Sequence, residues 1–190
     1  MTQPHDANPP HDSSALSPGS SWSRLVLVRH GIAQERERPD LDDDYRALTD
    51  RGARRVIEAA HGLARLKVKP RLILTSPLIR SRQTAELIAQ VLGRRDRVAV
   101  VEWLKPQVEP RDLAGALNAQ EVETLLAVGH NPNLSLCLRF LTQPEAEPAA
   151  TTPLAMLGKA SAAYLVRRPS HGPAQLKWLV SARMLRILGR

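Results

Sequence analysis

Short apolar runs alternate with amphipathic stretches along the chain from Trp22 onward. Runs of three or four consecutive apolar residues are typical of strands that are buried on both faces of a sheet. Such a run occupies residues 25–28, and residues 72–74 are predicted to be a second buried strand. Further apolar runs over 98–101 and 125–128 predict a third and a fourth strand. Because helical patterns lie between these runs, the order of elements predicts one α/β domain with a mostly parallel sheet.

The helices are predicted from their apolar stripes and from residues that favour helix ends. Thr49 is a suitable N-cap for a helix over 49–66, and Pro110 opens a short helix over 110–117. Ser76-Pro77 and Asn131-Pro132 each combine a capping residue with a proline, which predicts helices over 76–92 and 131–141. Gly93 is expected to end the former helix.

The last part of the chain departs from this regular alternation. Residues 143–153 are rich in Pro, Ala and Glu and are expected to form a loop. Residues 162–166 and 176–180 are predicted to be two strands of a hairpin, with Gly172-Pro173 between them. The predicted fold is therefore a three-layer α/β/α domain with a mostly parallel central sheet and a C-terminal hairpin.

The first 21 residues differ in composition from the rest of the chain. They contain four prolines and five serines but neither lysine nor arginine. Such a segment cannot bury enough apolar surface to offset the entropy lost on ordering. We therefore expect residues 1–21 to be a disordered tail and residues 22–190 to be the folded domain.

The formal net charge of +8 is carried by the predicted domain. Its 27 basic residues are opposed by 17 of the 19 acidic ones, because Asp6 and Asp12 lie in the tail, and residues 22–190 thus carry +10. A basic surface suits nucleic acid, anionic lipid or phosphorylated substrates. The chain has no apolar run long enough to span a bilayer, no apparent secretory leader and one cysteine, Cys137, which we interpret as a core residue. These features predict a cytoplasmic protein without a membrane partner.

Three of the predicted strands end in residues that suit phosphate chemistry. The first strand ends at Arg29-His30-Gly31, the second at Thr75-Ser76-Pro77 and the fourth at Gly129-His130-Asn131. Arg80 lies one turn into the helix that follows the second strand. Ligands of open α/β sheets bind beyond the carboxyl ends of the strands, so we expect these two histidines and two arginines to converge on one pocket.

These segments resemble the motifs of the histidine phosphatase (phosphoglycerate mutase-like) superfamily. Arg29-His30-Gly31 resembles its signature, residues 76–85 its S-P-x-x-R-x-x-Q-T-A motif, and residues 128–132 the segment that holds its second histidine. Residues 47–52 match its L-T-x-x-G helix start. The resemblance covers residues 22–183, and the compact length is most similar to the short SixA-type branch of phosphohistidine phosphatases.

The resemblance implies a role for each site residue. His30 is implied to be the nucleophile that forms a phosphohistidine intermediate, and His130 the partner that stabilises charge on the transferred group. Arg29, Gly31 and Arg80 are implied to bind phosphate, which agrees with the bidentate geometry of guanidinium–phosphate pairs. Neutral imidazole is itself a competent nucleophile, so the scheme requires neither a metal nor another cofactor.

Some charged residues near these motifs have a simpler interpretation. Arg82 is two helical positions from Arg80, so the two side chains point in different directions and only Arg80 is expected to reach the phosphate. Arg36, Arg38 and the acidic run over residues 40–44 follow the first histidine. We interpret Arg36, Arg38 and the acidic run as solvated loop residues, because charge runs usually face water.

The proton donor of the wider family has no obvious counterpart in this sequence. Mutase-type relatives carry a glutamate after the third strand, and the matching position here lies near Pro106. Glu102, Glu109 and Asp112 remain candidate donors. An alkoxide leaving group needs protonation, whereas the imidazole of phosphohistidine leaves more easily, so the missing acid favours a substrate with an N–P bond.

The leading hypothesis is a phosphatase that hydrolyses phosphohistidine in a partner protein. One alternative is a small-molecule phosphomonoesterase on the same scaffold, and another is an inactive relative that binds phosphorylated partners. A basic module that binds nucleic acid is a third, but six aromatic residues provide little surface for base stacking. We therefore expect a phosphorylated protein or a small phosphorylated molecule as the partner, rather than nucleic acid.

Overall fold

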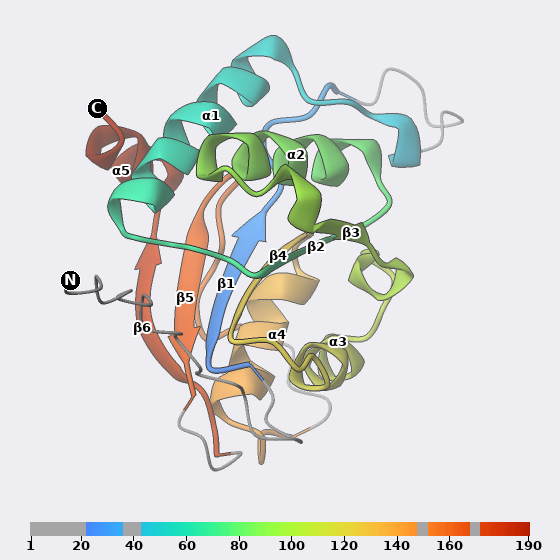
Figure 1. The fold of residues 1–190 in the computed structure, drawn as a ribbon. Helices are drawn as coiled ribbons and strands as arrows, with labels where there is room; N and C mark the ends of the chain where they lie inside the picture. The colour runs from blue at the N-terminus through green and yellow to red at the C-terminus, as the bar shows by residue number, and fades with distance from the viewer. Residues whose placement is uncertain (1–21, 36–42, 148–151, 168–171) are drawn as a thin grey trace, which may run out of the picture.

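The fold is built on one central sheet (Figure 1). The computed structural model describes residues 22–35, 43–147, 152–167 and 172–190, so the predicted tail and the positions of Arg36 and Arg38 lie outside the described residues. Within these residues six strands are hydrogen-bonded in the order β3-β2-β4-β1-β5-β6. The strands are β1 (Arg24–Arg29), β2 (Leu72–Thr75), β3 (Val98–Val100), β4 (Thr124–Gly129), β5 (Ala162–Val166) and β6 (Gln175–Val180).

Strands β1 to β4 form the parallel part of the sheet, and β5 and β6 extend it through antiparallel pairs. The pairs β2–β3, β2–β4 and β1–β4 are parallel, whereas β5 pairs antiparallel with both β1 and β6. The β5–β6 pair is the hairpin expected from the sequence. The fold prediction of a mostly parallel sheet with a C-terminal hairpin is therefore confirmed.

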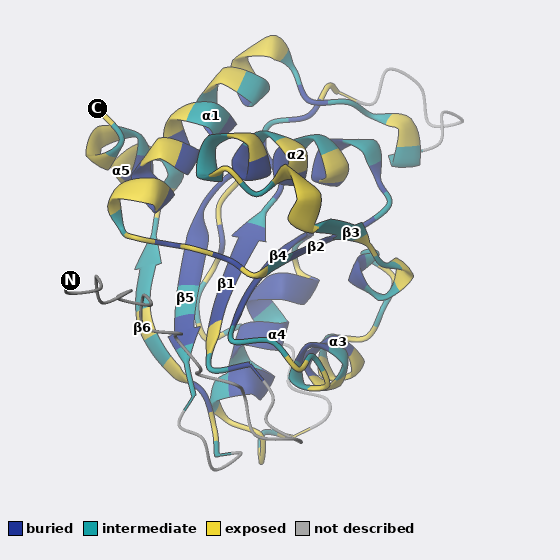
Figure 2. Cartoon of the chain, in the orientation of Figure 1, coloured by how far each residue is buried: buried dark blue, intermediate teal, exposed yellow. Residues whose placement is uncertain are grey.

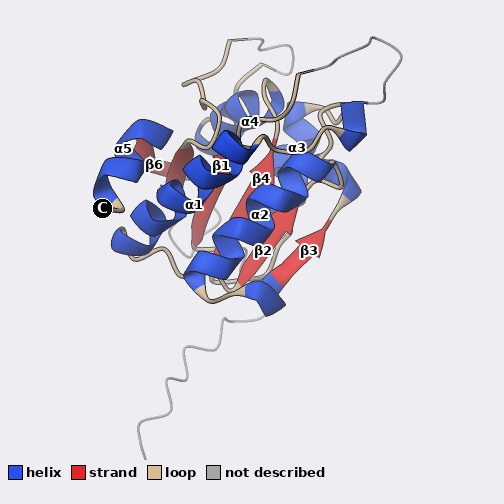
Figure 3. Ribbon diagram, turned by 90° about the horizontal axis from the view of Figure 1, so that it is seen from above, coloured by secondary structure: helices blue, strands red, loops and turns tan. Residues whose placement is uncertain are grey.

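Helices cover both faces of the sheet, which gives three layers (Figure 3). The helices are α1 (Asp50–Arg65), α2 (Ile79–Leu92), α3 (Pro110–Asn118), α4 (Asn133–Thr142) and α5 (Ala182–Leu188). Helices α1, α2 and α5 pack together on one face, and α3 and α4 pack together on the other. Among the described residues no helix combines the length and the apolar composition needed to cross a membrane.

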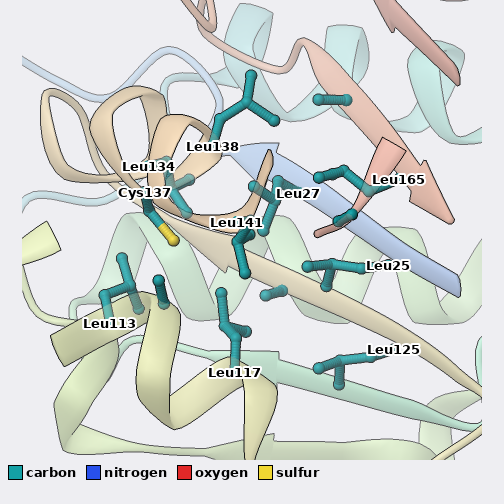
Figure 4. Packing of buried hydrophobic residues seen from close by; sticks show 14 of the residues in the cluster. Leu25, Leu27, Leu113, Leu117, Leu125, Leu134, Cys137, Leu138, Leu141 and Leu165 are labelled. Carbon is teal, nitrogen blue, oxygen red and sulfur yellow. The ribbon is translucent and has the colours of Figure 1, made fainter. Parts of the chain in front are cut away.

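The alternation of side chains along β1 produces two cores. Leu25 and Leu27 point into the cluster beneath α3 and α4, while Val26 and Val28 point into the cluster beneath α1 and α2. All four are buried, as Figure 2 shows for the middle of the sheet. Cys137 lies among leucines of α3, α4 and the strands (Figure 4), and this burial raises the pKa of its thiol. The cysteine is therefore a core residue, as the sequence predicted.

Two helix starts differ from those predicted. Helix α2 begins at Ile79 because the Ser76 hydroxyl accepts a hydrogen bond from the Leu78 amide in a turn that precedes the helix, instead of capping it. Helix α4 begins at Asn133, and the Asn131 amide nitrogen donates to the carbonyl of Leu157. In neither place does the polar side chain cap the helix, so the capping signal predicts each helix start only to within three residues.

A short C-terminal helix, α5, was not predicted from the sequence. Ser181 caps it by accepting a hydrogen bond from the Met184 amide, and its Leu185 is buried in the core under α1. Gly62 of α1 allows the two backbones to approach closely, because a Cβ atom on Gly62 would lie 2.1 Å from the Leu185 carbonyl oxygen. This close approach fixes α5 against the C-terminal part of α1.

We predict that Gly62→Ala destabilises the protein, since the added methyl group must push two backbones apart. The expected loss is on the order of 1–3 kcal/mol in the free energy of unfolding, measured by urea denaturation. Gly115→Ala in α3 is the matched control, because no atom lies within 4 Å of the added Cβ. It should gain roughly 0.5–1 kcal/mol from higher helix propensity. An equal effect of both substitutions contradicts the packing argument.

Candidate active site

Two histidines meet at the carboxyl ends of the central strands. Strands β1 and β4 are adjacent and parallel, and their register pairs Arg29 with Gly129, so the residues that follow both strands emerge side by side. The ring centroids of His30 and His130 are 5.0 Å apart, with the ring planes at 49°. Both side chains are buried. Residues 100 positions apart in sequence thus form one imidazole pair.

A backbone hydrogen bond sets the tautomer of His30. Its Nδ1 lies 2.7 Å from the carbonyl oxygen of Gly31. A carbonyl can only accept a hydrogen bond, so Nδ1 carries the proton and the Nε2 lone pair remains unprotonated. Nε2 is the atom through which this ring can act as a nucleophile.

Burial and nearby positive charge keep His30 neutral. Desolvation lowers its pKa to about 4, and the hydrogen bond to Gly31 opposes this shift. The charges of Arg80, Arg29 and Lys159 lower the pKa further. At neutral pH the imidazole is therefore uncharged, which is the protonation state that a nucleophile requires.

His130 is neutral for the same main reason. Burial lowers its pKa to about 3, with contributions from His30 and from the charge of Arg80. Its Nε2 is 2.9 Å from the buried hydroxyl of Ser76, while its Nδ1 has no hydrogen-bond partner among the described residues. One ring nitrogen is thus positioned by the protein, and the other is left without a protein contact.

Arg29 and Arg80 bring two guanidinium groups close to the histidines. Arg29 is half-buried and donates from Nη1 to the carbonyl of Leu157, whereas the Arg80 side chain is only 4% exposed. The Nε atom of each arginine is buried and lacks a partner among the described residues. Charges of both arginines act on the pKa values of His30 and His130, so the four side chains share one electrostatic environment.

Asp43 corrects the interpretation of the acidic run as a solvated loop. It lies in a 3-10 helix, η1 (Asp43–Tyr45), and its carboxylate accepts from Arg80 Nη2 at 2.6 Å while its carbonyl accepts from Arg80 Nη1 at 2.6 Å. Arg46 binds the other carboxylate oxygen. Desolvation raises the pKa of Asp43, but the two arginines outweigh this effect and hold it below its usual value. The positions before Asp43 in this run lie outside the described residues.

Thr84 is part of the matched motif over residues 76–85, but the sequence assigned it no role. Its hydroxyl accepts a hydrogen bond from the Gly31 amide at 3.0 Å and donates to the Arg80 carbonyl at 2.7 Å. It therefore joins the loop after His30 to the helix that carries Arg80. A threonine one turn after the arginine is a weak signal, because such hydroxyls commonly bond to the helix backbone itself.

The other charged candidates lie further toward solvent. Glu102 forms an ion pair with Lys105 at 2.7 Å, and its side chain is 75% exposed. Glu109 and Asp112 are exposed at the start of α3. Arg82 is exposed and lies 3.9 Å from Glu86 one turn further along α2, whereas Arg80 on the same helix is buried. Within the described segments no group of three or more His, Cys, Asp or Glu side chains is placed to hold a metal ion.

The structure resembles solved phosphatases. The SixA structure from Agrobacterium tumefaciens is 23% identical, covers 85% of this chain and 99% of its own, and has a TM-score of 0.70. A protein histidine phosphatase SixA complexed with tungstate is 24% identical over 85% of this chain and 99% of its own, with a TM-score of 0.71. A phosphoserine phosphatase from Entamoeba histolytica is 20% identical over 85% and 98% of the two chains, with a TM-score of 0.62. These similarities show a shared fold.

Sequence comparisons identify one relative and one matching family model. An uncharacterised protein of Picosynechococcus sp. is 37% identical over 118 residues, which cover 58% of this chain and 67% of that protein. The family model of the histidine phosphatase superfamily (branch 1) matches residues 25–105, the part that contains His30 and Arg80. His130 lies beyond the matched residues in the sequence, but the fold places its ring in contact with the ring of His30. With this motif segment matched and its fold shared, the chain belongs to the histidine phosphatase superfamily.

Proposed function

We propose that this protein is a phosphatase that uses His30 as its nucleophile, and that its substrate is phosphohistidine in a partner protein. One observation carries the proposal. Three buried nitrogen atoms around His30 lack a hydrogen-bond partner among the described residues: Nε of Arg29, Nε of Arg80 and Nδ1 of His130. Buried donors are usually satisfied, and leaving one unpaired costs about 1–3 kcal/mol. A phosphoryl group has the charge and the acceptor oxygens that such a set can bind.

In the first step the phosphoryl group moves to the protein. The Nε2 lone pair of His30 attacks phosphorus, an N–P bond to His30 forms, and the N–P bond to the substrate imidazole breaks. The departing imidazole retains the electron pair of the broken bond and takes a proton from water. Arg29 and Arg80 neutralise the equatorial oxygens, which removes the repulsion that a nucleophile meets at an anionic phosphoryl group.

In the second step water hydrolyses the phosphohistidine intermediate. Its oxygen attacks phosphorus, the bond to His30 breaks, and inorganic phosphate leaves as the free imidazole is restored. His130 is neutral in the free protein, but a bound anion favours its protonated form, in which Nδ1 can donate to a phosphoryl oxygen. The chain's own cations thus supply the charge stabilisation, and the proposed reaction proceeds without a metal ion.

The choice of an N–P substrate rests on the leaving group. Glu102 and Glu109, the candidate donors from the sequence, are exposed, and Glu102 is already paired with Lys105. An imidazole leaves without the strong acid that an alkoxide needs. Phosphohistidine therefore fits a site whose interior is lined by arginine and histidine. We also place the protein in the cytoplasm, because its one cysteine is buried in the core and fits a reducing compartment.

A small phosphate monoester is the second candidate substrate, and one contact favours it. The side chain of Asn133, three residues after His130, donates to the carbonyl of Pro106 at 2.8 Å and also to that of Val108. This holds the segment just before Glu109 against the start of α4. Glu109 is therefore tethered near the edge of the site, where it could serve as the acid for an alkoxide.

We predict that His30 carries a phosphoryl group during turnover. Incubation with labelled phosphoramidate, a quench in alkali and peptide mapping should locate acid-labile label on His30, and a chelator should not reduce it. His30→Ala should remove both label and phosphate release, because among the described residues no other buried imidazole has its Nδ1 fixed by a backbone carbonyl. His61→Ala, an exposed histidine on α1, is the matched control and should behave as wild type. Label that persists in His30→Ala overturns the mechanism.

We predict that Glu109→Gln separates the two substrate classes. If phosphohistidine is the substrate, the variant should release phosphate from a phosphohistidine peptide at the wild-type rate, because imidazole needs no carboxylic acid to leave. Phosphate release from a small monoester should be at least tenfold slower than from the peptide in both proteins, given the usual size of general-acid effects. Fast monoester hydrolysis that Glu109→Gln abolishes would establish the second candidate instead.

We predict that stability falls as the pH is lowered from 7 to 5. The folded pKa values of about 4 for His30 and about 3 for His130 lie below the usual 6.5, so below pH 6.5 the unfolded chain binds protons that the folded protein excludes. The loss should be on the order of 2 kcal/mol for each histidine at pH 5, measured by urea denaturation. His130→Gln should roughly halve the difference between the two pH values. An unchanged difference would show that His130 is not buried in its neutral form.

A further inference from the structure

A basic groove lies beside the candidate active site. It has a volume of about 580 Å³ and is lined by the charged side chains of Arg29, Arg55, Lys159, Arg183 and Arg186. The remaining lining residues are apolar or glycine, and no carboxylate is among them. Five cations along one groove repel one another, so the groove is electrostatically suited to an anionic ligand.

The groove is continuous with the phosphate site through the backbone. Arg29 belongs to both, and the Ala160 amide donates to the carbonyls of Arg29 at 3.0 Å and His30 at 3.1 Å. This bifurcated contact fixes the segment that carries Lys159 directly over the end of β1. The effect of the Lys159 charge on the pKa of His30 agrees with this proximity. A ligand held in the groove therefore lies next to the group that would be phosphorylated.

Most of the positive charge in the groove is not neutralised by the protein. Arg186 pairs with Glu58 on α1, which takes up one cation. Within the described parts of the chain, no carboxylate lies within ion-pair distance of Arg55, Lys159 or Arg183. Folding thus gathers these three charges from α1, from the segment before β5 and from α5 without an ion pair for any of them. Glu58, which pairs with Arg186, is the carboxylate whose pKa the Arg55 charge lowers. Selection of an anionic partner accounts for such an arrangement.

We propose that the basic groove binds an acidic segment of the substrate protein that flanks its phosphorylated histidine. This inference rests on the proposed function and adds the determinant of substrate choice. A single second phosphate group would be bound best by guanidinium groups that converge on one point in bidentate geometry. The groove cations instead come from four separate parts of the fold, namely β1, α1, the segment before β5 and α5, which matches carboxylates spaced along an extended chain.

The kinetic test compares two phosphohistidine peptides of equal length, one with glutamates and one with glutamines around the phosphorylated residue. The acidic peptide should have about a tenfold higher kcat/KM at low salt, and the difference should shrink as salt screens the groove. Arg55→Glu and Arg183→Glu should each lower kcat/KM for the acidic peptide about three- to tenfold. Both variants should leave the glutamine peptide and phosphoramidate hydrolysis unchanged.

The matched control is Lys177→Glu. Lys177 is an exposed lysine in the middle of the edge strand β6 and is not among the residues that line the groove, so its reversal makes the same change in net charge away from the groove. Equal effects of Lys177→Glu and Arg183→Glu would show that net charge, rather than the groove, selects the substrate. That result, or equal kcat/KM values for the two peptides in the wild type, overturns the proposal.

A binding measurement separates this inference from the proposed function. In His30→Ala, fluorescence anisotropy should detect the unphosphorylated acidic peptide, and adding Arg183→Glu should weaken its affinity about three- to tenfold. Binding of this kind without hydrolysis of either phosphohistidine peptide by the wild type would reject the proposed function and retain the groove as an acidic-peptide site. Hydrolysis of the phosphohistidine peptides without groove-dependent binding would retain the proposed function and reject the groove as an acidic-peptide site.

Discussion

The parallel pairing of β1 with β4 is the contact on which the site depends. Its register places Arg29 beside Gly129, so His30 and His130 leave the sheet as neighbours although 99 residues separate them along the chain. A shift of one residue would turn each side chain to the opposite face of the sheet. The two cores on either side of the strands prevent such a shift, because each depends on alternate residues of β1. The packing of the two cores therefore determines how His30 and His130 are placed at the carboxyl ends of the strands.

In that geometry the protein buries cationic and polar groups that lack some of their hydrogen-bond partners or counter-charges among the described residues. Arg80 is buried and its Nη atoms are satisfied by Asp43, while its Nε remains unpaired among the described residues. Asp43 thus supplies part of the negative charge that a buried guanidinium needs in the free protein. The histidines avoid the same cost by remaining neutral. These groups are held in fixed positions before any ligand arrives, so an anion gains their interactions without reorganising the site.

The sequence was sufficient to predict the strands and the residues at their ends, because both follow from local patterns. Apolar runs indicate buried strands, and Arg29-His30-Gly31 and Gly129-His130-Asn131 stand at their carboxyl ends. It was not sufficient where a side chain chooses between a local and a distant partner. Ser76 bonds to His130 as well as to its own turn, and Asn131 bonds to Leu157. Asp43 is the clearest such case, since nothing in an acidic run identifies which carboxylate meets a buried arginine.

Helix α5 was not predicted for a related reason. It contributes residues to the basic groove but none to the pair of histidines. Its seven residues are too few to form a stable helix alone, so it exists because Leu185 is buried under α1 and Gly62 allows close contact. That docking brings Arg183 and Arg186 to the basic groove. The residues proposed to bind phosphate lie on strand ends and on α2, whereas the groove depends on a helix held by tertiary packing alone. On the proposed function, changes in α5 therefore alter the groove that selects the partner and leave the imidazole pair as it is.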